Sequence, residues 1–427
     1  MSYPAIEAPS AEARTTDAPY AAASGPFMAF RIQTLLAIFL QRIGFNQTIG
    51  GVLYPLPVSL IGTPLVLGWL VWRGWARPSP ARIGLYCIMV VGACFSLLLA
   101  KSEVSSMSMY MYLILYGMFL FPVVLEDDAY ERYYRMILKV AVAVCLIGVA
   151  QYAIQYVWHP KWLFTWRDFI APEFLIEFNT LNWTSWGSGI YKANGFFLME
   201  ASWLSQLAAR ALLIAVILLR DPRYLIPCGA AMLATYSGTG ITLFVLFGAI
   251  PLMILYLRSP RLLPWAVLGA VAIPLVMMVF YRQLNLELFI TRLNEFESVN
   301  SSAYFRFVLS QQIFERFQAE PFLTLVFGSG PGTADTYLAG YVNDGFIPGW
   351  LKLSVDYGFV GFMAFSAFLV TCVYQTTQSR IIAAAVLFQY LWLDSSLVVP
   401  QAAFVTLLMM CAVVRRSTFR PFGAPAA

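Results

Sequence analysis

The stretch EASWLSQLAARALLIAVILLR (residues 200–220) carries charge only at Glu200, Arg210 and Arg220. An α-helix needs about 20 mostly apolar residues to cross the hydrocarbon core of a bilayer, and the segment between Glu200 and Arg220 has this length. We therefore predict a membrane-spanning helix that begins beside Glu200 and ends at Arg220.

Arg210 lies midway along this predicted helix, about 15 Å from either end at the helical rise of 1.5 Å per residue. An arginine at that depth costs about 2.5 kcal/mol or more unless it faces a polar cavity or a charged partner. Two interpretations remain open. Arg210 either forms an ion pair that ties helices together, with Asp356 or Asp394 as the partner, or it forms an anion site in a cavity open to the outside.

The rest of the chain has the same apolar character. Of its 427 residues, 60% are hydrophobic and only 11% are charged, whereas a soluble domain carries roughly a quarter charged residues. We predict an all-α polytopic membrane protein with a single transmembrane domain over 27–415, since the apolar runs are too continuous for barrel strands. About twelve candidate helices lie near 28–45, 52–72, 83–100, 106–125, 136–158, 199–219, 224–237, 240–257, 262–281, 350–375, 381–397 and 400–414.

Arginines mark every second connection between these runs. Cytoplasmic loops carry an excess of Lys and Arg, so we place these connections, and with them both termini, in the cytoplasm. Residues 1–26 are expected to be a disordered cytoplasmic tail and 416–427 a second tail. The marking residues are Arg73, Arg77, Arg82, Arg132, Arg135, Arg220, Arg223, Arg258, Arg261, Arg380, Arg415 and Arg416.

Two of the alternate, outer connections are long, at about 159–198 and 282–349. Loops beyond about 15 residues are usually functional or disordered. The first is aromatic, which is typical either of an interfacial belt or of a sugar-stacking platform. Its aromatic residues include Trp162, Trp166, Trp183, Trp186, Phe164, Phe169, Phe174 and Phe178.

The second long connection is predicted to contain two short amphipathic helices on the outer leaflet, because apolar residues recur at helical spacing over 284–296 and 304–317. The apolar face expected for the later helix consists of Tyr304, Phe307, Val308, Phe314 and Phe317.

The distribution of basic residues, histidine and cysteine excludes several kinds of binding site. No Lys/Arg-rich run indicates nucleic-acid binding. His159 is the only histidine, which excludes a multi-histidine metal site. The six cysteines fall in apolar stretches at no metal-ligand spacing, so we expect neither a metal ion nor a cofactor.

Charged residues beside the outer connections are the candidates for a site. Glu200 lies where the aromatic segment re-enters the membrane, and it either has a raised pKa suited to acid/base work or is merely solvated. Arg282, Arg292, Arg306 and Arg316 either snorkel individually, or several of them together bind a diphosphate. Downstream, Gly328, Gly330 and Gly332 form a turn whose backbone N–H groups are suited to a phosphate, although a plain flexible turn is the commoner meaning.

Three stretches resemble one known family. KANGFFLMEAS (192–202) resembles the motif (Arg/Lys)-x-x-Gly-Phe-Phe-x-x-Glu-Pro-Ser, and YSGTG (236–240) resembles the turn Ser-x-(Thr/Ser)-(Gly/Arg)-x. RLNEF (292–296), SSAYFRF (301–307) and GSGPG (328–332) resemble an Arg-bearing loop followed by Gly-x-Gly-x-Gly. Together they resemble the O-antigen polymerase/ligase superfamily, specifically its exopolysaccharide polymerase (Wzy-type) branch, over about residues 140–375.

The resemblance implies metal-independent glycosyl transfer between two undecaprenyl-diphosphate-linked oligosaccharides at the periplasmic face. It implies that Glu200 is the base and that Arg210 and Arg306 stabilise the leaving diphosphate, which makes these three the catalytic set. Further partners would be membrane lipid and a chain-length-determining or export protein. The diphosphate- or glycan-binding residues would be Lys192, Arg292, Arg282, Gly328, Gly330, Gly332 and Tyr236.

One departure from the superfamily bears on the choice of activity. Its ligases carry a His-Asn pair where this chain has Ile347-Pro348, which disfavours ligation. The alternatives that remain open are ligase-type transfer to another acceptor, a lipid-linked oligosaccharide flippase and a solute transporter. The transporter is disfavoured because no internal repeat is evident.

Overall fold

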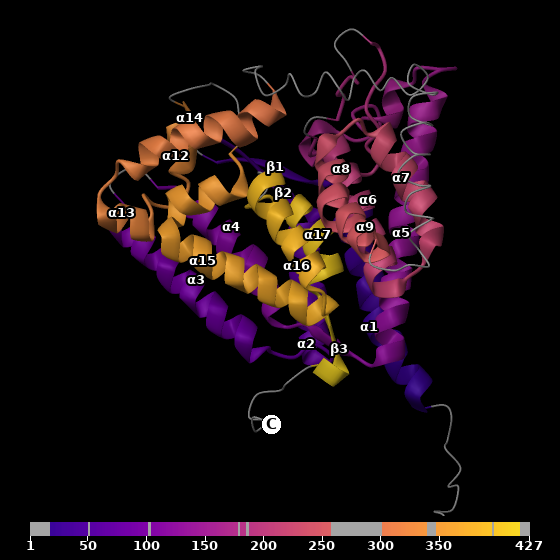
Figure 1. The fold of residues 1–427 in the computed structure, drawn as a ribbon, viewed down its shortest axis with the longest axis horizontal. Helices are drawn as coiled ribbons and strands as arrows, with labels where there is room; N and C mark the ends of the chain where they lie inside the picture. Colours follow the sequence, from indigo (N-terminus) through magenta and orange to yellow (C-terminus); the bar gives the residue numbers. More distant parts are fainter. Residues whose placement is uncertain are drawn as a thin grey trace, which may run out of the picture.

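The structure is a computed structural model that describes residues 18–49, 52–100, 104–177, 180–184, 188–257, 301–339, 347–394 and 397–418. Within these residues the chain is mostly helical, and four helices are long and apolar enough to cross a membrane. Figure 1 shows them in a bundle of packed helices. They are α3 (Pro80–Leu99), α5 (Asp127–Ile154), α6 (Ala201–Leu213) with its continuation η5 (Ile214–Leu219), and α15 (Gly349–Thr377).

Shorter apolar helices fill the rest of the bundle, and most of them coincide with the predicted runs. The predicted helix at 262–281 lies outside the described residues. The shorter elements are α1 (Ala18–Thr34), η1 (Leu35–Phe39), α2 (Val58–Trp72), α4 (Ser106–Gly117), η2 (Met118–Leu120), α7 (Leu225–Ala234), α8 (Gly238–Phe244), η7 (Val245–Ala249), α9 (Ile250–Leu257), α16 (Arg380–Phe388), η10 (Gln389–Leu393) and α17 (Pro400–Met410).

The expectation of an all-helical chain is wrong in detail, because two small sheets are present. Strands β1 (Gly44–Ile49) and β2 (Val52–Pro57) form an antiparallel pair, and β3 (Val123–Leu125) pairs in parallel with β4 (Val413–Arg415). Residues 52–57 were expected to be helical, yet Pro55 and Pro57 remove backbone donors that a helix needs. The first helix also begins at Ala18, inside the segment expected to be a tail.

The basic connections that the structure describes meet at one end of the bundle. There β3 pairs with β4, and Ala76, which follows α2, bridges to Val123. The buried Arg82 donates hydrogen bonds to the carbonyls of Phe119 (2.8 Å) and Cys411 (2.7 Å). We call this the basic end; Figure 1 shows the start of α1 and β3 there, at the bottom of the view. Its arginines include Arg82, Arg135, Arg223, Arg415 and Arg416.

The long connections meet at the opposite end, which we call the loop end. The amide of Asn46 in β1 donates to the carbonyls of Pro172 (2.7 Å) and Leu175 (2.9 Å) in the first long connection. The backbone N–H of Ser105 donates to the Pro331 carbonyl (2.8 Å) of the second. Helices α12 (Ser310–Gln318) and α14 (Ala334–Ala339) lie at this end, at the top of Figure 1. This is the arrangement that the alternation of charge predicted.

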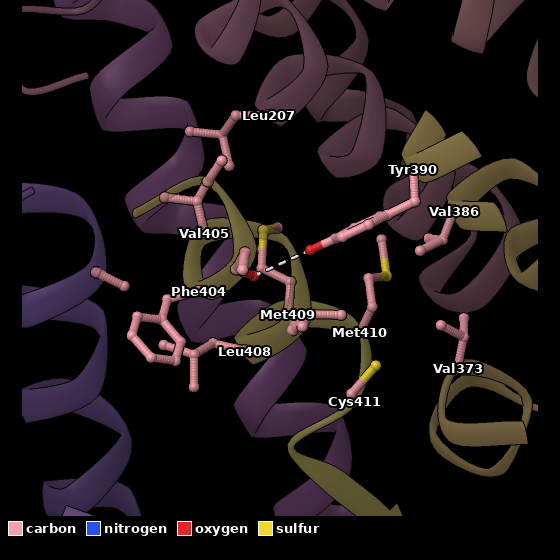
Figure 2. Close-up of a cluster of buried hydrophobic side chains, with 14 of the residues drawn as sticks. Leu207, Val373, Val386, Tyr390, Phe404, Val405, Leu408, Met409, Met410 and Cys411 are labelled. Carbon is pink, nitrogen blue, oxygen red and sulfur yellow. Dashed lines mark hydrogen bonds between the residues drawn. The ribbon is translucent and has the colours of Figure 1, made fainter. Parts of the chain in front are cut away.

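Helix α17 lies in the core and is buried on every side, since each of its residues from Pro400 to Met410 is buried. A helix that is apolar all round is enclosed by protein or lipid rather than facing water. Figure 2 shows Tyr390 directed at this helix, where its hydroxyl donates to the Ala403 carbonyl (3.4 Å). Because lipid tails are as apolar as leucine, close packing rather than the hydrophobic effect holds such a helix in place.

Helices α16 and α17 form a hairpin that turns inside the bundle. The 11 residues of α17 extend about 16 Å, well short of the roughly 30 Å of a hydrocarbon core. The helix before it ends at Leu393, where Asp394 adopts an extended backbone (φ −103°, ψ 142°). The predicted helix at 381–397 therefore runs too far. Irregular backbone at such depth is tolerated where it lines a polar cavity, and Asp394 lies at that point.

A single buried arginine clamps the first long connection to the bundle. Arg42 donates to the carbonyls of Phe164 (2.9 Å) and Leu198 (3.1 Å) and pairs with Glu177 at 3.4 Å. Glu177 also accepts hydrogen bonds from Thr165 and from the Trp166 backbone, both at 2.6 Å. Burial lowers the pKa of Arg42 to about 10, although the negative charge of Glu177 raises it in part.

Replacing Arg42 by Ala is expected to lower the free energy of unfolding by about 3–5 kcal/mol, because it leaves the buried Glu177 carboxylate without its buried cation. The measurement is a denaturation curve of the purified protein in detergent. Arg167 is the matched control, since it pairs with the same carboxylate but is 70% exposed, and Arg167→Ala is expected to change stability by less than about 1 kcal/mol. Equal effects of the two substitutions would contradict the clamp.

Candidate active site

A buried polar network surrounds Arg210. Its Nη1 donates to the Gln389 Oε1 at 2.8 Å. The Gln389 amide donates to Gln206 (3.0 Å) and to Asp394 (2.9 Å), and the Gln206 amide donates to the other Asp394 oxygen (2.7 Å). All four side chains are buried. We call Gln206, Arg210, Gln389 and Asp394 the buried network.

Of the two carboxylates expected beside Arg210, the network contains Asp394 and not Asp356. The charge of Asp394 acts on Arg210, but the hydrogen bonds pass through Gln389. The Nε of Arg210 has no hydrogen-bond partner among the described residues. The guanidinium is therefore only partly satisfied by the protein, which leaves a buried donor available to an anion.

Local backbone structure brings these side chains together. Gln389 is the first residue of η10, a π-helical turn; such turns are often found at functional sites. Gln206 and Arg210 are four residues apart on α6 and so share one face of that helix. Asp394 accepts from both glutamines because the chain leaves the helix directly before it.

Glu200 and Arg306 lie at the loop-end side of the buried network. Glu200 directly precedes α6, whereas Arg306 belongs to η9 (Tyr304–Leu309) and donates to the Leu393 carbonyl (2.9 Å), next to Asp394. Burial raises the pKa of Glu200, the charge of Arg306 and a hydrogen bond with Ser202 lower it, and Asp394 raises it further. A partly desolvated carboxylate with adjacent cations is suited to accept a proton.

Lys192 belongs to the same electrostatic group, because its charge also lowers the pKa of Glu200. Its backbone N–H donates to the Asn182 carbonyl (2.7 Å), which fixes the chain in front of α6. Of the predicted residues, the structure thus brings together Glu200, Arg210, Arg306 and Lys192. Arg282 and Arg292 lie outside the described residues.

An open pocket of about 390 Å³ adjoins Arg306. Its walls combine aromatic rings with amide and carboxylate groups, a mixture suited to stacking on sugar rings and bonding their hydroxyls. The Nε1 of Trp350 is buried and has no acceptor among the described residues. The pocket is lined by Arg306, Phe307, Gln311, Phe314, Glu315, Gln318, Trp350 and Trp392.

The amphipathic helix expected over 304–317 is present as η9 and α12, but its buried face differs from the expected one. Phe307 is 40% exposed and lines the pocket instead. The π-helical turn of η9 shifts the register, so that a face spaced for an ordinary α-helix is misassigned. The segment 284–296 lies outside the described residues. The buried face consists of Phe305, Leu309, Ile313 and Phe317.

The glycine-rich turn at 328–332 was expected to bind a diphosphate. In the structure, Asp356 of the same chain lies against it. The N–H of Ala334 donates to the Asp356 carboxylate (2.8 Å), and that of Gly330 donates to the Asp356 carbonyl (3.3 Å). Lys352 lies 3.5 Å from the same carboxylate. These contacts give the turn a structural role, and the assignment of Gly328, Gly330 and Gly332 to substrate stays a prediction.

All three glycines of this turn have positive φ, from 80° to 122°. At Gly328 a Cβ would collide with the Asp356 backbone, so the turn packs directly on the kink of α15 at Gly358. Only glycine adopts such a conformation without strain.

Tyr236 occupies a neighbouring position, at the loop-end start of α8. Its hydroxyl is 2.8 Å from that of Tyr152, which is 2.6 Å from that of Tyr156. At Gly240 a Cβ would collide with Ser205, so the glycine allows α8 to approach α6 closely. This motif therefore supports the helix that bears Arg210.

The aromatic residues of the first long connection divide into two groups. Phe164 and Trp166 are buried, and Arg42 lies over the Trp166 ring at 5.4 Å. The exposed members are Trp162, Phe169, Phe174 and Trp183, whereas Trp186 and Phe178 lie outside the described residues.

The chain matches no protein-family model, and no curated protein or solved structure is detectably similar to it. Within the described part of the chain, no group of three or more His, Cys, Asp or Glu side chains is placed to hold a metal ion.

Proposed function

We propose that this chain is a multi-pass glycosyltransferase that polymerises undecaprenyl-diphosphate-linked oligosaccharide repeat units into exopolysaccharide. It would lie in a bacterial inner membrane with about twelve transmembrane helices, the basic end in the cytoplasm and the loop end in the periplasm. The observation that carries this proposal is the convergence of Glu200, Arg210 and Arg306 on a buried network beneath an open aromatic pocket.

The reaction joins two lipid-linked glycans. A hydroxyl oxygen of the acceptor sugar attacks the anomeric carbon of the donor, and its proton passes to the Glu200 carboxylate. The bond from that carbon to the diphosphate breaks, and the lipid diphosphate leaves with the electron pair. Arg210 and Arg306 stabilise the negative charge that develops on it, as fixed cations in a site that excludes water do most strongly.

The remaining residues act in binding. Lys192 lies beside Glu200 and contacts the glycan or phosphate; Arg282 and Arg292 supply further charge from the long connection. Glycan rings lie in the pocket beside Arg306, stacked on Phe307, Trp350 or Trp392. A ligase-type transfer or a flippase is the alternative that the following experiment separates from polymerisation.

The test uses purified protein in proteoliposomes with lipid-linked repeat units and EDTA. We expect a ladder of polymer on a gel, with release of lipid diphosphate. Arg316→Ala is the matched control, because this arginine of α12 stacks on Tyr337 and does not line the pocket. Movement of repeat units across the bilayer without polymer, or a requirement for added metal or nucleotide, would overturn the proposal.

A further inference from the structure

A second pocket lies at the basic end, far from the proposed site. It has a volume of about 390 Å³ and lies between α5 and the start of α7. Three of its lining side chains are cationic, Arg135, Lys139 and Arg223, and Tyr224 adds a hydroxyl. Its apolar lining comes from Val142 and Pro227. None of the residues assigned to the proposed glycosyl transfer lines this pocket.

Two of the cations are fixed in position by acids of the chain. Arg135 pairs with Glu131 (2.6 Å) and with Asp221 (3.5 Å), and Arg223 pairs with Asp221 (2.7 Å). Hydrogen bonds from Arg223 lower the pKa of Asp221 to about 2, so this carboxylate is ionised at every physiological pH. The acids hold the guanidinium groups in place and offset part of their charge.

Lys139 is the cation whose charge no acid offsets. It is exposed and has no acidic partner among the described residues. The Nη1 of Arg223 likewise has no acceptor there, because Nε and Nη2 make its bonds to Asp221. The pocket therefore presents a free ammonium and a prepositioned guanidinium, which together suit the oxygens of a phosphate.

Apolar surface continues from the pocket along the same two helices. On α5, Leu146 is 54% exposed, and on α7, Ile226 is 83% exposed. A free phosphate ion would make no favourable contact with this apolar surface, whereas the acyl chain of a lipid would cover it. Basic pockets between membrane helices on the cytoplasmic side are typical binding sites for anionic lipid headgroups.

We propose that this pocket binds the phosphate headgroup of an anionic phospholipid, with Lys139 and Arg223 on the phosphate and the acyl chains along α5 and α7. The inference requires that the chain lies in a membrane, but it does not depend on glycosyl transfer. A bound lipid would join α5 to the connection before α7, and so support the two helices that flank α6.

The test measures lipid binding by the full-length protein in detergent, from the rise in melting temperature on titration with phosphatidylglycerol, phosphatidylcholine or inorganic phosphate. We expect phosphatidylglycerol alone to stabilise the wild type. Lys139→Gln should weaken its apparent affinity about fivefold, and the double variant with Arg223→Gln more than tenfold, from about 1 kcal/mol per basic residue. Lys139→Gln breaks no ion pair, so its folding should be unaffected.

Arg380→Gln is the matched control, since Arg380 is an exposed arginine at the start of α16 and does not line this pocket. It should bind phosphatidylglycerol like the wild type. Equal stabilisation by phosphatidylcholine would overturn the headgroup assignment, and equal stabilisation by inorganic phosphate would overturn the lipid. Wild-type affinity in Lys139→Gln would show that the pocket is not the site. Polymer formation by these variants tests the proposed function separately.

Discussion

Replacement of Glu200 by Gln is expected to abolish high-molecular-weight polymer and to leave single repeat units on their lipid. The substitution keeps the size and hydrogen bonding of the side chain and removes its ability to accept a proton. Loss of a general base lowers rates about 10²–10⁴-fold. The measurement is the rate of glycosyl transfer by purified variants on lipid-linked repeat units.

The pH dependence distinguishes a base from a residue that only positions substrate. Burial raises the pKa of Glu200, and a base must be ionised, so activity of the wild type should fall as the pH is lowered through that raised value. The charge of Arg306 lowers the same pKa. In Arg306→Ala the acidic limb of the remaining activity should therefore move to higher pH. An unchanged acidic limb in Glu200→Gln would contradict the assignment.

Replacement of Arg210 by Ala is expected to lower the rate of transfer about 10²–10³-fold, the usual consequence of removing one fixed charge-stabilising group. Arg210→Lys should recover little of this activity, because the ammonium is a single compact charge, whereas the planar guanidinium bonds Gln389 through one nitrogen and presents donors on the others in a fixed geometry suited to a diphosphate. Rates are measured on the same lipid-linked substrate.

A structural explanation for Arg210 predicts a different pattern. Removal of the cation leaves Asp394 buried, so Arg210→Ala also lowers stability. The double substitution Arg210→Ala/Asp394→Asn removes both charges and should restore part of the stability but none of the activity. Recovery of polymer formation in the double variant would show that Arg210 serves only to neutralise Asp394.

The helices were the most predictable part of the fold, because runs of apolar residues are a direct consequence of the membrane. The run between Glu200 and Arg220 became α6 and η5 almost residue for residue. The hairpin of α16 and α17 was less predictable. Its sequence is apolar beyond Asp394, so hydropathy alone does not reveal that the chain turns back inside the bundle.

Only the charged residues of the candidate site could be predicted from the sequence. Arg210 and Glu200 are conspicuous in apolar surroundings, and Asp394 was one of two expected partners for Arg210. Gln206 and Gln389 were not predicted, because an uncharged amide in a membrane helix does not by itself indicate a site. The spacing of Gln206, four residues before Arg210, was the available signal. The buried pair of Arg42 and Glu177 left no such signal, because its members are 135 residues apart.

The complete enclosure of α17 has a consequence for biosynthesis. Helix α17 follows every other described α-helix in the chain, yet those helices surround it. During synthesis they must leave its place open, and until α16 and α17 emerge Arg210 lacks both Gln389 and Asp394. An unpartnered arginine is poorly tolerated in lipid, so the nascent α6 has to remain beside water or the insertion machinery until the last hairpin arrives. Final closure of the bundle and completion of the site are therefore one and the same event.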